Sequence, residues 1–343
     1  APPPGALERD PRKPETAVKV LASDRAGRWL VVSMWHPAMG FQPFLIDREA
    51  QIAERLPKPG ERSGQSTKLI VSWGRMPPTT LARVKVRDGL ELPVVVTVPA
   101  DHKGGPLPTV VRARSFMNHT FDLDHDVGAK FLAERGYAVV SVNARGAAGF
   151  GKALLAAGAG QYATGAIDDL EDVAKWAVAQ GIAAPDRLAV YGEVHGGYGA
   201  LVAIGRGESP FKVAVAISPV SDLVDVFDRQ ADAGSWYALR LRQFYGWQDG
   251  ADNRRTLLEA SPINWVPRLE RPLLIAPRPT DDPPQRMQSE RLVAALRAAG
   301  RDPTPPPSTD RFARRLDGGE GAFWRQLEVF LGGHLGGQVH NHE

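Results

Sequence analysis

The sequence contains no cysteine, which excludes disulfide bonds, thiol nucleophiles and thiolate metal sites. Long apolar runs are also missing: the longest, such as Val213–Ile217, are far too short to cross a bilayer, so we expect no transmembrane segment. Blocks of lysine and arginine are missing as well, and 42 basic against 39 acidic side chains leave a net charge of only +3. This balance argues against a nucleic-acid partner.

The chain has 343 residues, enough for one large domain or two modest ones. It begins Ala-Pro-Pro-Pro without methionine, a start that suits a processed, periplasmic or secreted protein and suits a fragment equally well. Residues 1–16 are rich in proline and charge, and we expect a flexible arm there. Residues 338–343 are expected to form a tail. Its His340-x-His342-Glu343 could bind a metal adventitiously, but a frayed tail is the better interpretation. We expect neither a metal site nor a cofactor.

Short β-like runs and turn signals dominate residues 17–75. We expect strands at 17–22, 29–34 and 43–47, with a break at 57–66. A hairpin should follow, with strands at 81–87 and 90–98 joined by a two-residue Asp88-Gly89 turn.

From Gly104 onward, strands alternate with helices. The expected strands are 109–113, 137–142, 187–191, 212–217 and 271–276. The expected helices are 126–135, one capped by Thr164 and ended by Gly181, 195–204, 285–299 and 323–331, with 222–262 helical and irregular. This alternation predicts a parallel sheet covered by helices on both faces.

The most informative motif is Gly-Glu-Val-His-Gly-Gly at 192–197, where an apolar strand turns sharply into a helix of small residues. This is the setting of a nucleophile elbow, Gly-x-Ser-x-Gly, in which the serine stands exposed above the sheet. Here the central residue is Val194, whose side chain carries no nucleophilic atom. The simpler alternative is a glycine-rich turn of any doubly wound fold.

Further motifs accompany this turn along the chain. They are Val142-Asn143-Ala144-Arg145-Gly146, Gly149-Phe150-Gly151-Lys152, Asp168-Asp169-Leu170, Gly196-Gly197-Tyr198, Ser218-Pro219-Val220-Ser221-Asp222, Ser261-Pro262-Ile263-Asn264, Arg271-Pro272-Leu273-Leu274-Ile275 and His334-Leu335-Gly336-Gly337. Together they make the chain resemble the catalytic domain of the prolyl oligopeptidase family of serine peptidases. The resemblance implies an α/β-hydrolase fold with a mostly parallel central sheet over 76–337. It also implies that 17–75 is a remnant of the β-propeller usual in that family, lost here or completed elsewhere.

Carried over position by position, the resemblance places the catalytic serine on Val194, the acid on Asp281 and the histidine on Asp310. The oxyanion-side His-Gly-Gly-Pro loop reads Arg114-Ser115-Phe116-Met117. The His-Gly before the acid reads Pro277-Arg278, and the strand before Asp310 is filled with proline at 303–307. The resemblance therefore implies a degenerate triad that keeps only its acid, and we expect no catalytic residues at these positions.

Several side chains could line what remains of the pocket, and each has a plainer interpretation. The pocket candidates are His195, Tyr198, Arg145, Trp236 and Tyr245. His195 would otherwise pack in the core, as would the aromatic and basic stretch 236–247. Asp281 and Asp310 could face each other as a carboxylate pair, or could be two solvated loop acids.

Three functional hypotheses follow. The first is a pseudoenzyme that binds a protein partner or supports an assembly. The second is an enzyme of another class that uses Asp281 or Asp310 for acid/base chemistry in the old pocket. The third is a serine-type peptidase or esterase with relocated residues, which requires a serine or threonine beside a histidine.

Overall fold

The computed structural model describes residues 17–24, 26–36, 40–49, 52–56, 77–113, 126–230, 236–246, 251–278, 281–303 and 320–339. The expected arm at 1–16, most of the break before residue 77, and the final residues 340–343 lie outside these ranges. The predicted domain boundary near 76 therefore stays a prediction.

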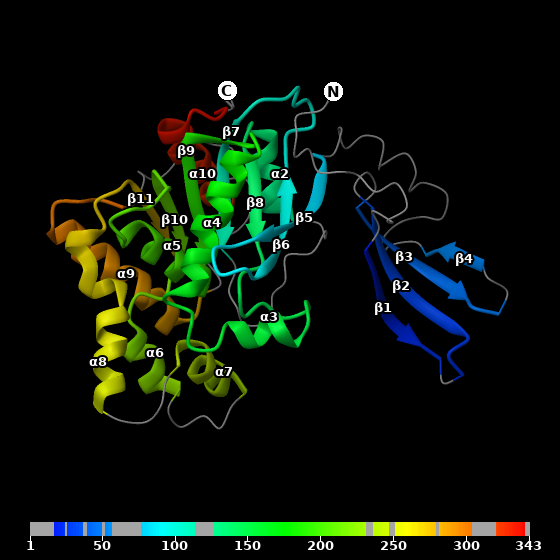
Figure 1. Cartoon of the computed structure of the whole chain (residues 1–343), viewed down its shortest axis with the longest axis horizontal. Coiled ribbons are helices and arrows are strands. Elements are labelled where there is room, and N and C mark those ends of the chain that lie inside the picture. Colours follow the sequence, from blue (N-terminus) through cyan, green and yellow to red (C-terminus); the bar gives the residue numbers. More distant parts are fainter. Residues whose placement is uncertain are drawn as a thin grey trace.

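A four-stranded antiparallel sheet comes first in the chain and lies to one side of the larger sheet (Figure 1). Each strand pairs with the next along the chain. The strands are β1 (Ala17–Ser23), β2 (Trp29–His36), β3 (Gly40–Asp47) and β4 (Ile52–Arg55). The sequence predicted the first three, whereas β4 is too short to give a clear alternation. A four-stranded meander is also the form of one propeller blade.

The next element is the expected hairpin, formed by β5 (Thr79–Lys85) and β6 (Glu91–Thr97). Its predicted two-residue turn is wrong. The Val86 N–H donates to the Leu90 carbonyl at 2.9 Å, which leaves Arg87, Asp88 and Gly89 in the loop. Gly89 has a φ of +89°, and a three-residue loop needs such a left-handed residue at its end.

The larger sheet has seven strands in the order β11-β10-β9-β7-β8-β6-β5. Its parallel strands are β7 (Leu107–Ala113), β8 (Ala138–Val142), β9 (Ala183–Glu193), β10 (Val213–Ile217) and β11 (Leu273–Ala276). The expected mostly parallel sheet is thus confirmed. Ile217 of β10 is in register with Glu193 of β9 and with Ala276 of β11. The carboxyl ends of these three strands therefore lie side by side at one edge of the sheet.

Helices cover both faces of this sheet (Figure 1). They are α2 (Val127–Glu134), α3 (Lys152–Ala157), α4 (Gly165–Ala179), α5 (His195–Gly205), α6 (Leu223–Gln230), α7 (Trp236–Tyr245), α8 (Ala251–Ala260), the 3₁₀ helix η1 (Pro262–Arg268), α9 (Pro283–Ala298) and α10 (Glu320–Leu335). Helix α3 was not predicted, and its six residues are too few for a helical period to stand out. Within the described ranges, every helix is too short or too polar to span a lipid bilayer.

Two apolar clusters explain why the sheet is covered on both sides. Along β9, Leu188 and Val190 pack against α4 and α5, whereas Ala189 and Tyr191 belong to a second cluster with α2 and α10. Because side chains alternate between the faces of a strand, a strand buried on both faces must be apolar at every position. This reads in the sequence as the uninterrupted apolar run before Gly192.

Helices α2 and α4 begin differently. Asp126 caps α2, since its carboxylate accepts from the Ala129 N–H at 3.0 Å. Thr164 stands at the first boundary of α4 but does not cap it with its side chain. Its hydroxyl donates instead to the side-chain carbonyl of Gln161 at 3.1 Å, so the capping prediction is wrong.

Candidate functional site

The turn between β9 and α5 has the geometry of a nucleophile elbow, with Val194 at its centre. Val194 has φ of 52° and ψ of −110°, a conformation that a β-branched residue rarely adopts. The backbone around it is fixed to β10, because the Val194 N–H donates to the Ile217 carbonyl at 2.9 Å. The Val194 carbonyl accepts from Tyr198 at 3.0 Å and from Val220 at 3.2 Å. The surrounding structure therefore holds the strained turn in place.

The glycines of the motif are required by close backbone contacts. A Cβ on Gly192 would lie 2.1 Å from the carbonyl carbon and oxygen of Gly196. A Cβ on Gly197 would lie 3.0 Å from Cα of Pro219, in the segment after β10. The spacing of glycines thus reflects the tight approach of α5 to the strand ends, as an elbow needs.

Beneath the elbow, His195 is buried in a group of aromatic side chains. Only 2% of its surface is exposed, and its Nδ1 lies 3.1 Å from the Tyr245 hydroxyl. Burial lowers the pKa of His195 to about 4, so its imidazole is neutral near pH 7. Tyr162 donates its hydroxyl proton to the His195 carbonyl. These contacts place the His195 ring in the core rather than in a position to activate a nucleophile.

Tyr198 and Arg145 are also held within the fold. Tyr198 is fully buried and donates to the Ala260 carbonyl at 3.1 Å, and burial raises the pKa of its hydroxyl. Arg145 forms ion pairs with Asp169 and Asp88, both at 2.8 Å. Hydrogen bonding to Asp169 is the largest influence that raises the pKa of Arg145. Arg145 therefore ties the β5–β6 loop to α4, a structural role rather than the expected pocket position.

Asp281 lies at the same sheet edge as Val194, and its side chain is completely buried. One carboxylate oxygen accepts from the Ser218 hydroxyl and from the Arg278 backbone N–H at 2.8 Å. The other accepts from the Arg278 Nε at 3.2 Å. Arg278 also pairs with Glu193, whose carboxylate lies 3.5 Å from its Nη1. We call Glu193, Ser218, Arg278 and Asp281 the edge cluster.

Sequence reasoning missed two members of the edge cluster. Ser218 lies directly after β10 and has a φ of 46°, and it was noted only as part of a motif. Glu193 directly precedes Val194 and was given no role. The signal that could have found them is positional, because residues just after the carboxyl ends of neighbouring parallel strands share one edge.

The remaining candidates lie outside what the structure describes. Arg114, Ser115 and Asp310 fall in the undescribed segments 114–125 and 304–319, and for Trp236 only the helical backbone is described. The proline-rich stretch is described at its first residue alone, where the Pro303 carbonyl accepts from the Ile275 N–H at 2.9 Å. In the described ranges, no three His, Asp or Glu side chains converge to hold a metal ion.

The elbow at the carboxyl edge of a mostly parallel sheet, with helices on both faces, defines an α/β-hydrolase fold. The family model of the prolyl oligopeptidase peptidases matches residues 124–304, more than half of the chain. The chain therefore belongs to the prolyl oligopeptidase family.

Curated relatives agree with this family assignment, and a solved structure agrees with the fold. The chain is 29% identical to dipeptidyl aminopeptidase BIII of Pseudoxanthomonas mexicana over 82% of its own length and 39% of that protein. It is 34% identical to dipeptidyl peptidase family member 6 of Caenorhabditis elegans over 48% of the chain and 23% of that protein. A puromycin hydrolase structure superposes with a TM-score of 0.73 at 19% identity, covering 92% of this chain and 47% of that one. The chain thus spans well under two thirds of the length of these proteins.

Proposed function

We propose that this chain is a non-hydrolytic member of the prolyl oligopeptidase family that binds a protein partner or supports an assembly. The observation that carries the proposal is Val194 at the centre of the elbow. Acyl transfer by this fold needs an oxygen nucleophile there, and a valine side chain offers only carbon and hydrogen. In a serine peptidase, removing the nucleophile alone costs on the order of a million-fold in kcat.

The contacts of Asp281 support the same proposal. A triad acid orients the catalytic histidine through a hydrogen bond. Here Asp281 accepts from Ser218 once and from Arg278 twice. A carboxylate has about four acceptor positions, so most of its capacity is taken by these two residues.

Neither alternative hypothesis gains a supporting contact in the described residues. Acid/base chemistry by Asp281 would require a carboxylate open to a substrate, and this side chain is completely buried. A relocated nucleophile would have to be accessible, whereas Ser218 is fully buried and donates to Asp281 rather than to a histidine. The pairing of Asp281 with Asp310 stays a prediction, because Asp310 lies in an undescribed segment.

A turnover assay tests the proposal. Dipeptide and acylated amino-acid anilides would be incubated with the purified protein, with dipeptidyl aminopeptidase BIII as the active control. We expect no release above buffer, and none from Val194→Ser either, because a hydroxyl without a base is a weak nucleophile. Turnover that copurifies with the unaltered protein would contradict the proposal.

Purification from the native source tests the binding role. We expect the protein to elute in a stable complex whose partner is identified by mass spectrometry. Elution of the protein alone, with no partner recovered after mild crosslinking, would count against a role in an assembly.

A further inference from the structure

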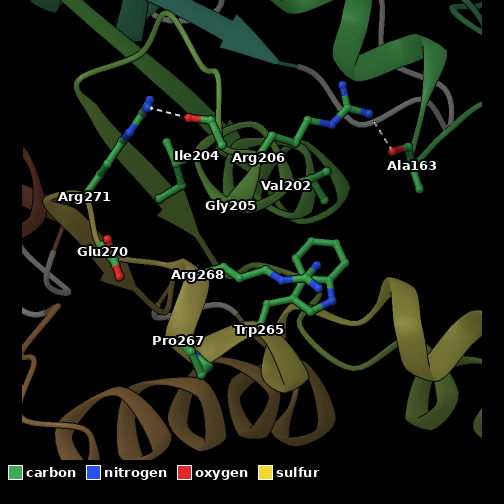
Figure 2. A pocket seen from close by; sticks show the side chains of 11 residues that line it. Ala163, Val202, Ile204, Gly205, Arg206, Trp265, Pro267, Arg268, Glu270 and Arg271 are labelled. Carbon is green, nitrogen blue, oxygen red and sulfur yellow. Dashed lines mark hydrogen bonds between the residues drawn. The ribbon is translucent and has the colours of Figure 1, made fainter.

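A pocket of about 770 Å³ lies at the opposite end of α5 from Val194. The last residues of α5 form one side, and η1 with the segment leading into β11 forms the other (Figure 2). We call it the α5-end pocket. Since α5 rises about 1.5 Å per residue, its 11 residues separate this pocket from the elbow by roughly 15 Å.

The α5-end pocket carries three arginines and a single acid, Glu270, among its lining residues. Two of the arginines are committed to the fold. Arg206 pairs with Asp168 at 2.6 Å and donates to the Ala163 carbonyl at 3.1 Å. Arg271 donates to the carbonyls of the loop after α5, including Ser209 at 2.9 Å, and no acid among the described residues forms an ion pair with it, so its positive charge adds to the field at the pocket.

Arg268 differs from these two arginines, because its side chain is exposed and no described acid lies within ion-pair distance of it. Its guanidinium lies 5.9 Å from the centre of the Trp265 ring, and both side chains face the same space (Figure 2). The Trp265 indole is itself fixed, since its N–H donates to the Glu259 carbonyl at 2.6 Å. Val202 and Ile204 close the pocket on the α5 side, with their side chains buried in the core.

We propose that the α5-end pocket binds a small carboxylate that carries an aromatic ring, either as a free acid or as the last residue of a peptide. Arg268 binds the carboxylate through its planar pair of N–H donors, a geometry that matches carboxylate oxygens. The ring packs on the Trp265 indole. Arg271 strengthens the attraction through its charge. This site is separate from the elbow and does not depend on the proposed loss of hydrolysis.

The test is a titration of the full chain by isothermal calorimetry with 3-phenylpropanoate. We expect a Kd on the order of 1 mM, as befits a small ligand held by one ion pair and one ring. The matched neutral ligand, 3-phenylpropanamide, should bind at least about tenfold more weakly, because it cannot pair with a guanidinium. Equal affinity for the acid and the amide, or no saturation at about tenfold above that Kd, would overturn the proposal.

Variants assign the binding to this pocket. Arg268→Ala should weaken 3-phenylpropanoate binding by roughly tenfold or more, and Trp265→Leu should weaken it while leaving binding of propanoate unchanged. Arg254→Ala, which removes an exposed arginine outside the pocket, is the control and should change nothing. Unchanged affinity in Arg268→Ala would place the binding elsewhere and refute the site. Arg268 is exposed, so its variant should fold normally.

A last comparison separates the two sources of the carboxylate. A short peptide that ends in phenylalanine would be titrated with a free and with an amidated terminus. Tighter binding of the free-terminus peptide than of 3-phenylpropanoate identifies chain termini as the ligand, and weaker binding identifies a free acid. If chain termini are the ligand, the amidated peptide should not bind. Equal binding of the free and amidated peptides would contradict recognition through the carboxylate.

Discussion

The Nε of Arg278 lies 3.2 Å from a carboxylate oxygen of Asp281, whose side chain is completely buried. The charge that keeps the carboxylate of Asp281 stable in the interior comes from a residue of its own loop. In a working triad the same carboxylate would face a histidine. The edge cluster therefore works as a structural clamp that joins the ends of β9, β10 and β11.

This relationship predicts that Arg278→Ala destabilises the protein. The variant leaves the buried Asp281 without its charged partner, and we expect a loss of about 1–3 kcal/mol, reduced from the fully buried case because Arg278 is 41% exposed. Urea unfolding measures this loss. Arg254→Ala removes an exposed ion pair with Asp228 and should leave the midpoint unchanged. Equal midpoints for both variants would show that the clamp contributes nothing.

The strained backbone of Val194 predicts an unusual response to glycine. A non-glycine residue in such a backbone region costs about 1–3 kcal/mol of strain. Val194→Gly removes this strain, and it also removes a half-buried side chain. We expect its unfolding free energy to equal or exceed that of the unaltered protein. Val173→Gly, inside α4 and fully buried, should lose about 3 kcal/mol or more. A comparable loss in both variants would mean that the elbow stores no strain.

The close approach at Gly192 predicts that Gly192→Ala is severely destabilising. Its new Cβ would lie 2.1 Å from the Gly196 backbone, which cannot move without opening the elbow. We expect a loss above about 3 kcal/mol or failure to fold. Gly333→Ala is the matched control, because Gly333 is an exposed helical position with open space around it and should gain up to about 1 kcal/mol. Circular dichroism during heating compares the two, and a Gly192→Ala protein as stable as the control would refute the contact.

Burial of His195 predicts a loss of stability in mild acid. Its folded-state pKa of about 4 lies below the ordinary value of 6.5, so the unfolded chain takes up the proton first. The stability that depends on the neutral His195 imidazole is fully present above about pH 6.5, falls as the pH drops, and is lost below about pH 4. Its size is roughly 1.4 kcal/mol for each unit by which the folded and unfolded pKa values differ.

His195→Gln should therefore flatten the decline in unfolding free energy between pH 6.5 and pH 4, and urea titrations at several pH values measure this. His334→Gln, at an exposed position of α10, should leave the decline as it is in the unaltered protein. Parallel curves for the protein and His195→Gln would contradict a neutral, buried imidazole.

Much of the fold could be predicted because apolar runs and glycines report local geometry. The runs 188–191 and 213–217 are apolar at every position, and Gly192, Gly196 and Gly197 mark the elbow between β9 and α5. The three-residue loop at Gly89 was missed, because one glycine serves turns of two and of three residues equally well.

The site was harder to predict, because its contacts join segments far apart in the sequence. Ser218 meets Asp281 across 63 positions, and only the order of β9, β10 and β11 brings them together. Arg145 belongs to a motif that resembles the family's, and it was a pocket candidate for that reason. In the structure its side chain forms an ion pair with Asp169 instead. Arg268 and Trp265 form no motif at all, so the α5-end pocket becomes visible only once η1 packs beside α5.

Intact-mass spectrometry after treatment with a fluorophosphonate, which adds covalently to an activated serine, tests the proposed lack of hydrolysis. With Val194 at the elbow and Asp281 held by Arg278, we expect the protein to keep its unmodified mass while dipeptidyl aminopeptidase BIII in the same tube gains one adduct. A stoichiometric adduct on this chain would show that it carries an activated serine and would refute the proposed loss of hydrolysis.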